Sequence, residues 1–165
     1  MLTAVAVILG YFAFPIFPQV PFLEYDLCDV LVLIASFTFG PIYGIMSSFT
    51  VAVVQAFLLD KSGVYGFIMN IISTTALVLP AALVYMKHKT RKGAVISLIT
   101  GTVTMVAVMT AFNYIITPFF MGLTVSAMHS FMPFIIAFNL VKAVVNSIIT
   151  FIVYKHIGKL IKKFS

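Results

Sequence analysis

Residues 131–154 read FMPFIIAFNLVKAVVNSIITFIVY, an apolar stretch long enough to cross a membrane as one helix. Lys142 is the only charged residue within it. A charge near the centre of a bilayer costs about 3 kcal/mol or more, so an ionisable residue at this depth usually marks a binding site or a transport pathway. Asn139 and Asn146 precede and follow Lys142 by three and four residues, which places all three on one helix face. We therefore predict a polar helix face with a function inside the membrane.

Two interpretations of this polar face remain open from the sequence. In the first, Asn139, Lys142 and Asn146 face a cavity and contact a polar molecule. In the second, Lys142 pairs with a buried carbonyl or acid and holds the helices together. We favour the first interpretation because intramembrane ionisable residues are generally functional.

The composition of the chain is that of an integral membrane protein. Of its 165 residues, 62% are hydrophobic and 8% are charged, whereas a soluble domain has about 25% charged residues. We expect residues 1–165 to form one membrane domain, with room for roughly five to seven helices. Residues 1–10 lack the basic start and the cleavage site of a signal peptide. The net charge of +6 comes mostly from lysines at membrane edges, so it does not indicate nucleic-acid binding.

We expect an all-α bundle of six membrane segments. Their approximate ranges are 2–17, 29–39, 42–59, 64–86, 94–117 and 131–154. Gly40-Pro41 is expected to end the second segment and Pro118 the fifth, because proline interrupts a helix; residues 119–130 then form a loop. One helix over 29–59 would leave five spans, but its length of about 46 Å exceeds a hydrocarbon core of about 30 Å. The second segment is therefore short, tilted or partly buried.

The distribution of charge predicts the orientation in the membrane. Eight of the ten basic residues form two clusters, Lys87, Lys89, Arg91 and Lys92, then Lys155, Lys159, Lys162 and Lys163. Two spans separate the clusters, so the positive-inside rule places both clusters and both termini in the cytoplasm. The loop 19–26 between the first two segments then lies outside. The four acids, Glu24, Asp26, Asp29 and Asp60, are expected at or near the outer side together with Lys61. With no acid expected at membrane depth, coupling to an ion gradient is poorly supported.

Polar residues are expected to gather where segments end on the outer side: Asn70, Ser73, Asn113, Asn139 and Lys142. Amide and ammonium groups together suit a planar heterocycle with carbonyls and ring nitrogens, or a polyol. The aromatic residues Phe12, Phe17, Tyr25, Tyr65 and Tyr114 can supply stacking faces, although taken singly they are more typical of a core or an interface belt. Gly63 and Gly66 can allow a flat ring to approach closely, although tight helix packing is the commoner use of glycine.

Several classes of chemistry are not indicated. Cys28 is the only cysteine, which excludes an internal disulfide, and His88, His129 and His156 lie far apart without metal-ligand spacing. His129 is expected in a loop at the surface. No phosphate-binding glycine loop is present, and no nucleophile is paired with a base, so we predict neither ATP hydrolysis nor enzymatic activity, and no cofactor.

The sequence resembles the riboflavin-binding S-components of energy-coupling factor (ECF) transporters over essentially its whole length. The resemblance is carried by FPIFP (14–18), FLEYDLCDV (22–30), IASFTFGP (34–41), SGVYGFIMN (62–70), FNY (112–114) and FNLVK (138–142). It implies six helices, a riboflavin site near the outer face that the first loop caps, and uptake of riboflavin as the transported ligand across the bacterial plasma membrane. It also implies partners, namely a transmembrane coupling subunit and two cytoplasmic ATPases.

The resemblance also implies roles for residues. Asn113, Asn139 and Lys142 would hydrogen-bond the flavin, and Tyr25 and Asp26 would belong to the lid. The full set of candidate ligand-binding residues is Leu23, Tyr25, Asp26, Tyr65, Gly66, Met69, Asn113, Tyr114, Asn139, Lys142 and Asn146. The small residues Ala6 and Gly10 would form the docking surface for the coupling subunit, although family members usually have two alanines there. The alternative function is a self-sufficient secondary carrier for another small planar vitamin or amphipathic molecule.

Overall fold

The computed structural model describes residues 1–57, 63–122 and 124–164, and it is all-helical except for one small hairpin. The helices are α1 (Leu2–Tyr11), α2 (Cys28–Phe39), α3 (Pro41–Phe57), α4 (Gly63–Lys87), α5 (Arg91–Met121) and α6 (Val125–Phe164). Strands β1 (Phe14–Pro15) and β2 (Glu24–Tyr25) pair antiparallel within the loop that joins α1 to α2. The expected turn at Asp60 and Lys61, and the expected end of the third segment at Leu59, lie outside the described residues.

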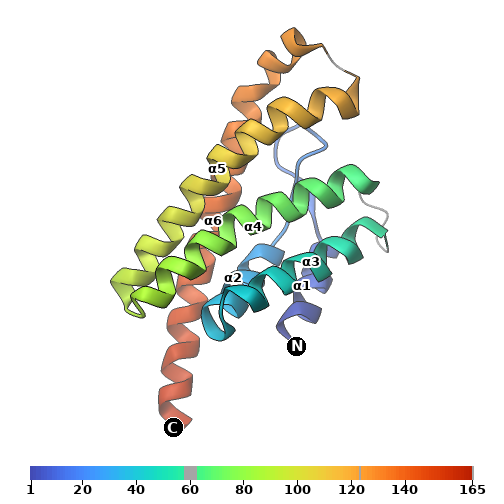
Figure 1. The fold of residues 1–165 in the computed structure, drawn as a ribbon. Helices are drawn as coiled ribbons and strands as arrows, with labels where there is room; N and C mark the ends of the chain where they lie inside the picture. The colour runs from blue at the N-terminus through green and yellow to red at the C-terminus, as the bar shows by residue number, and fades with distance from the viewer. Residues whose placement is uncertain (58–62, 123, 165) are drawn as a thin grey trace.

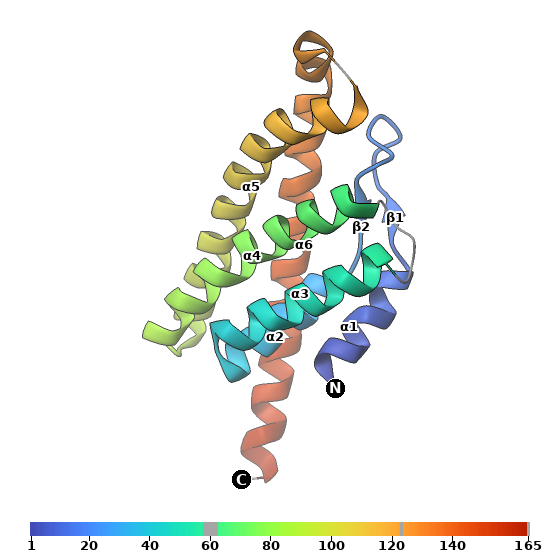
Figure 2. The same cartoon turned by 45° about the vertical axis from the view of Figure 1, so that its right-hand side comes forward.

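Three of the helices are long and apolar enough to cross a membrane: Gly63–Lys87 in α4, Arg91–Phe120 in α5 and Met128–Tyr154 in α6. The helices α1, α2 and α3 are apolar but shorter. Helix α5 packs against α4 and α6, α3 lies between α2 and α4, and α1 covers α2 and α3. The connected ends of α5 and α6 project beyond the other helices, while both termini lie towards the opposite end (Figures 1 and 2).

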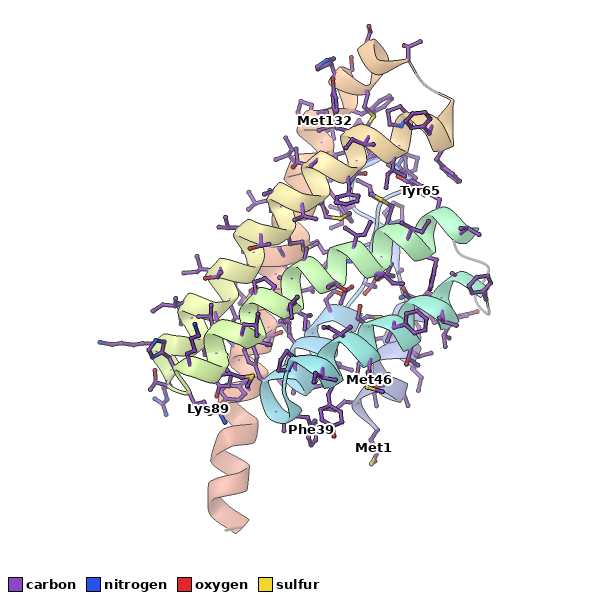
Figure 3. The ribbon with its side chains drawn as sticks, viewed as in Figure 1. Met1, Phe39, Met46, Tyr65, Lys89 and Met132 are labelled. Carbon is purple, nitrogen blue, oxygen red and sulfur yellow. The ribbon has the colours of Figure 1, made fainter. Side chains whose placement is uncertain are left out.

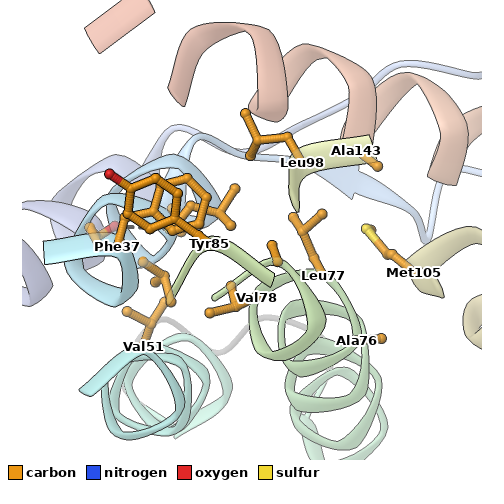
Figure 4. Packing of buried hydrophobic residues seen from close by; sticks show 14 of the residues in the cluster. Phe37, Val51, Ala76, Leu77, Val78, Tyr85, Leu98, Met105 and Ala143 are labelled. Carbon is orange, nitrogen blue, oxygen red and sulfur yellow. Dashed lines mark hydrogen bonds between the residues drawn. The ribbon is translucent and has the colours of Figure 1, made fainter. Parts of the chain in front are cut away.

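The core is centred on α4, which packs against α2 and α5 (Figure 4). Leu33, Leu77 and Met105 come from these three helices and are fully buried. Phe37 stacks on Tyr85 with ring centroids 4.4 Å apart, and the hydroxyl of Tyr85 is hydrogen-bonded to that of Tyr154 on α6. These contacts hold α2, α4 and α6 together.

The second helix is short and buried, as the sequence predicts. Nine of the twelve residues of α2 are buried. The helix ends at Gly40, whose φ of 102° favours glycine, and α3 begins at Pro41, where a proline is well tolerated in the first turn of a helix. The break at Gly40-Pro41 therefore separates two helices instead of bending one.

Three predicted boundaries are wrong. Helix α1 ends at Tyr11 instead of residue 17, because the chain turns into β1, where Pro15 cannot supply a helical N–H. Pro118 does not end α5; it lies within the last turn, and the helix ends at Gly122, whose left-handed conformation caps the carbonyl of Pro118. The expected loop 119–130 is thus reduced to a short connection before Val125. The membrane-spanning part of α6, Met128–Tyr154, ends where the sequence predicts, and the helix itself continues to Phe164.

Candidate functional site

A cavity of about 110 Å³ lies between the α1–α2 loop and helices α3, α4, α5 and α6. Its lining residues are Ala13, Phe22, Leu23, Glu24, Asp26, Ala52, Gln55, Ala56, Tyr65, Gly66, Met69, Asn70, Ser73, Met109, Phe138, Asn139 and Lys142. Tyr65, on this wall, lies at the opposite end of α4 from the basic turn that contains Lys89 (Figure 3). The cavity therefore lies towards the end of the bundle that is remote from this basic turn.

Lys142 reaches the cavity from α6 as part of a buried charge cluster. Its Nζ lies 3.5 Å from Oδ2 of Asp26 and 3.5 Å from Oδ2 of Asp29. The lysine is 7% exposed and Asp29 is 2% exposed. Both sequence interpretations of Lys142 thus hold in part, because the lysine lines a cavity and also pairs with acids.

These buried carboxylates correct the expectation that no acid lies at membrane depth. Asp26 lies at the end of the loop and Asp29 in the first turn of α2, positions that the sequence places at the outer edge. The folded chain instead carries the start of α2 inward, between α4 and α6. Burial of the two acids is possible because Lys142 and several hydrogen-bond donors meet them there.

The two carboxylates are held differently. Oδ1 of Asp26 accepts a hydrogen bond from the backbone N–H of Cys28 at 2.9 Å, within its own turn. Asp29 is bound by side chains from two other helices, since Oδ1 accepts from Oγ1 of Thr74 at 2.7 Å and Oδ2 accepts from Nδ2 of Asn146 at 3.3 Å. Tyr25 donates to Oδ1 of the same asparagine at 2.9 Å.

Amide side chains form the wall of the cavity on α3 and α4. Nδ2 of Asn70 donates to Oε1 of Gln55, and Nε2 of Gln55 donates to Sγ of Cys28 at 3.3 Å. Asn139 lies on the α6 side, and its Nδ2 donates to the carbonyl of Ile135 at 2.9 Å. The cavity thus offers amide oxygens, an ammonium group and carboxylates to a polar ligand, between apolar surfaces.

Seven of the candidate ligand-binding residues line the cavity: Leu23, Asp26, Tyr65, Gly66, Met69, Asn139 and Lys142. Four others are not part of its wall: Tyr25, Asn113, Tyr114 and Asn146. Tyr25 donates a hydrogen bond to Asn146, and Asn146 donates one to Asp29, the carboxylate partner of Lys142. Of the predicted polar face of α6, Asn139 and Lys142 therefore line the cavity, whereas Asn146 binds Asp29 outside its wall.

Asn113 reaches the cavity only through neighbouring side chains. It donates to the carbonyl of Met109 at 2.8 Å and accepts from Thr117 at 3.0 Å, and Thr117 in turn contacts the hydroxyl of Tyr65 at 2.7 Å. Tyr65 also stacks on Phe120 with centroids 4.0 Å apart. Asn113 thus fixes the orientation of an aromatic residue that does line the cavity.

Tyr114 faces away from the cavity. It is 39% exposed, and its hydroxyl lies 3.5 Å from Nε2 of His129. His129 belongs to α6 and not to a loop, because the helix starts earlier than predicted; it is exposed, as expected. Among the described residues, no group of histidine, cysteine and acidic side chains could hold a metal ion.

Sequence reasoning missed Gln55 as a cavity residue, together with Phe22, Glu24 and Phe138. Gln55 is the only amide side chain in α3, which contains no charged residue, and this is a usable signal for an inward-facing polar residue. Phe22 and Phe138 carry no such signal, because apolar residues are common throughout the chain.

Ala6 and Gly10 do not form an external docking surface, contrary to the prediction. Both are buried on the face of α1 that packs on α2 and α3. The carbonyl of Ala6 accepts a hydrogen bond from Sγ of Cys28 at 2.9 Å, and a Cβ at Gly10 would meet the side chains of Gln55 and Cys28. These small residues let α1 approach the rest of the chain and are not available to a partner.

The α1–α2 loop is fastened to the projecting end of α6 by a small apolar cluster. Val20, at the tip of the loop, is fully buried against Met128 and Ile135 of α6. Phe17, Phe22 and Leu23 of the same loop pack around this contact. Because Phe22 and Leu23 also line the cavity, the position of the loop tip determines how this wall of the cavity is closed.

Val20→Asp is expected to detach the loop from α6, because an unpaired carboxylate is costly in an apolar cluster. We expect faster amide hydrogen exchange across residues 12–27, measured by mass spectrometry of the detergent-purified protein. Gln19→Asp is the matched control, since it places the same charge on an exposed neighbour. Equal exchange in the two variants would show that Val20 does not hold the loop.

Comparisons with known proteins agree over nearly the whole chain. Residues 1–154 match the family described as ECF transporter, substrate-specific component. Riboflavin transporter RibU of Staphylococcus aureus (strain TCH60) is 28% identical, over 99% of this chain and 89% of its own length. Riboflavin transporter FmnP of Bacillus subtilis (strain 168) is 34% identical, over 70% of this chain and 62% of its own length.

The fold is also similar to that of a solved structure. It is described as "Structure and mechanism of the S component of a bacterial ECF transporter" and superposes with a TM-score of 0.88 at 30% identity. The superposition covers 98% of this chain and 94% of that one. The similarity therefore includes the helices that surround the cavity as well as the α1–α2 loop.

Proposed function

The chain belongs to the substrate-specific components of ECF transporters, and on this basis we propose that it captures riboflavin in the cavity between the α1–α2 loop and α6. It is a multi-pass protein of the bacterial plasma membrane. Its relatives are transporters and not enzymes, so the expected activity is binding and release without chemistry on the ligand.

The observation that carries this proposal is the pair of Asn139 and Lys142 on the cavity wall, one helical turn apart. The ammonium group is a hydrogen-bond donor, the amide is both donor and acceptor, and Asp26 on the same wall is an acceptor. This set matches the edge of a planar ring that carries carbonyls and an N–H group. Tyr65, held by Thr117 and by stacking on Phe120, provides an aromatic surface for such a ring.

The amide side chains on α3 and α4 offer hydrogen bonds to a second part of the same ligand, a chain of hydroxyl groups. Gln55, Asn70 and Ser73 lie together there and offer several donors and acceptors. A chain of hydroxyl groups needs such mixed partners. The cavity therefore suits a ligand with a flat heterocycle and a polyol chain, which is the chemistry of riboflavin.

We further propose that the cavity opens to the outside and that both termini are cytoplasmic. The basic turn that follows α4 would face the cytoplasm by the positive-inside rule, and the cavity lies towards the opposite end of the bundle. The α1–α2 loop would then act as the lid. As in the family, release to the inside would require a coupling subunit and ATPases, because no ATP-binding motif is present in this sequence.

The experiment that tests the proposal is a titration of the detergent-purified protein with riboflavin, followed by quenching of flavin fluorescence. We expect saturable quenching, and a yellow protein when purification retains the ligand. Thiamine, a vitamin without the flavin ring system, is the control and should not compete. A colourless protein that leaves riboflavin fluorescence unchanged would contradict the proposal and direct the search to other vitamins.

A secondary carrier remains the alternative, and the buried acids Asp26 and Asp29 are the observation that favours it. Intramembrane carboxylates can carry protons or bind ions during transport. This alternative would be supported if vesicles that contain this chain alone took up riboflavin and the uptake depended on a proton or sodium gradient. Uptake that requires ATP and added partner subunits would exclude it.

A further inference from the structure

Lys142 has two carboxylate partners that differ in their relation to the cavity. Asp26 lines the cavity together with the lysine, whereas Asp29 is not among the cavity-lining residues of the described chain. Both have an oxygen 3.5 Å from Nζ of Lys142. An ammonium group has three N–H donors. Two of them can be directed at the carboxylates, which leaves one for an acceptor atom in the cavity.

Asp29 is the more firmly held of the two acids. It belongs to α2, and it accepts hydrogen bonds from Thr74 on α4 and from Asn146 on α6, so three helices fix its position. Asp26 belongs to the loop, and its other described hydrogen bond comes from the backbone two residues further on. Movement of the loop would therefore displace Asp26 more readily than Asp29.

We propose that Asp29 is the positioning residue of the ligand site, acting as the permanent counter-ion of Lys142, while Asp26 is the exchangeable partner on the cavity side. A bound ligand that accepts a hydrogen bond from Lys142 competes with Asp26 for the ammonium group. Without Asp29, this competition would leave a lysine charge unpaired at membrane depth, where an unpaired charge is costly. Asp29 keeps the charge of Lys142 paired whether or not a ligand is bound, and it holds the ammonium group at the cavity wall.

The other ionisable groups near this cluster are consistent with these roles. Glu24 lines the cavity on the loop side, and the hydroxyl of Tyr25 is engaged with Asn146. Cys28 donates its thiol to the carbonyl of Ala6, away from the lysine. Asp26 and Asp29 are therefore the carboxylates that meet Lys142 directly.

The test is a double-mutant cycle with Asp29→Asn and Lys142→Met, read by thermal stability and by riboflavin affinity in detergent. The stability arm needs no ligand and does not depend on the proposed function. Lys142→Met leaves two buried carboxylates without a cation and is expected to lower the melting temperature. Adding Asp29→Asn removes one of these charges, so the double variant should recover at least half of that loss. A double variant no more stable than Lys142→Met alone would overturn the proposal.

The affinity arm rests on the proposed function. Asp29→Asn is expected to weaken riboflavin binding by about 30-fold, the low end of the range for truncating one partner of a buried charge pair, because Asp26 remains beside Lys142. In the Lys142→Met background it should cause no further loss, because Asp29 acts through the lysine; an additive loss would indicate a purely structural role and would overturn the proposal. Thr74→Val, which removes one donor to Asp29, provides a milder variant with a smaller loss in the same direction. If the wild type itself fails to bind riboflavin, the proposed function fails and the stability arm alone decides the role of Asp29.

Discussion

Lys142→Met is expected to reduce riboflavin affinity by about 2–5 kcal/mol, or roughly 30-fold to several thousand-fold. Methionine keeps much of the volume of the lysine stem but removes the donor group on the cavity wall. It also leaves Asp26 and Asp29 as buried carboxylates without their cation. The loss is measured by fluorescence quenching, with size-exclusion chromatography to show that the variant remains folded.

Ser147→Ala is the matched control for this variant. Ser147 lies on the same helix and is buried, but its hydroxyl pairs with Thr102 of α5 at 3.2 Å, away from the cavity. Its replacement should leave riboflavin affinity within about 3-fold of the wild type, since a typical intramolecular hydrogen bond contributes only about 0.5–1.5 kcal/mol to folding and this one does not touch the site. A folded Lys142→Met variant with unchanged affinity would refute the assignment of the lysine to the ligand site.

Gly101→Leu is expected to disrupt the packing of α5 on α4. A Cβ at Gly101 would collide with the backbone carbonyl of Leu77 and would lie 3.0 Å from Cβ of Ala81. Backbone cannot rotate away as a side chain can, so the helices would have to separate. Overpacking of this kind costs about 1–3 kcal/mol or more, and a lower melting temperature in detergent would measure it.

Val103→Leu is the control for added bulk on α5. Val103 is 64% exposed on the outer surface of the bundle, where an extra methylene meets lipid or detergent instead of α4. Its melting temperature should stay close to that of the wild type. Equal melting temperatures for the Gly101 and Val103 variants would mean that α4 and α5 do not approach as closely as the structure shows.

Helix boundaries were predictable where a local signal marks them. Gly40-Pro41 ended the second segment as predicted, and the expected range 64–86 differs by one residue at each end from α4 (Gly63–Lys87). Pro118 was misleading because α5 continues past it to Met121, although a proline there cannot donate to the carbonyl four residues earlier. The short length of α1 was missed because the apolar residues 12–17 fit a membrane helix equally well.

The candidate site was predictable from α6 alone, but its partners were not. The spacing of Asn139, Lys142 and Asn146 defines one helix face, and the structure buries all three. The acids that meet Lys142 come from residues more than one hundred positions away. The segment ranges and the positive-inside rule placed these acids at the outer edge, because both report on a residue's neighbours in the chain and not on its neighbours in space.

The amino-acid pattern alone is enough to identify a helical membrane protein, the location of most of its segments, and the polar face of α6. These properties depend on local composition and on the helical repeat. Only the tertiary structure decided that Asp26 and Asp29 pair with Lys142, that Gln55 joins the cavity, and that Ala6 and Gly10 face inward. The physical reason is that lipid tails are as apolar as a protein core, so hydrophobicity alone does not distinguish a helix face that meets lipid from one that meets another helix.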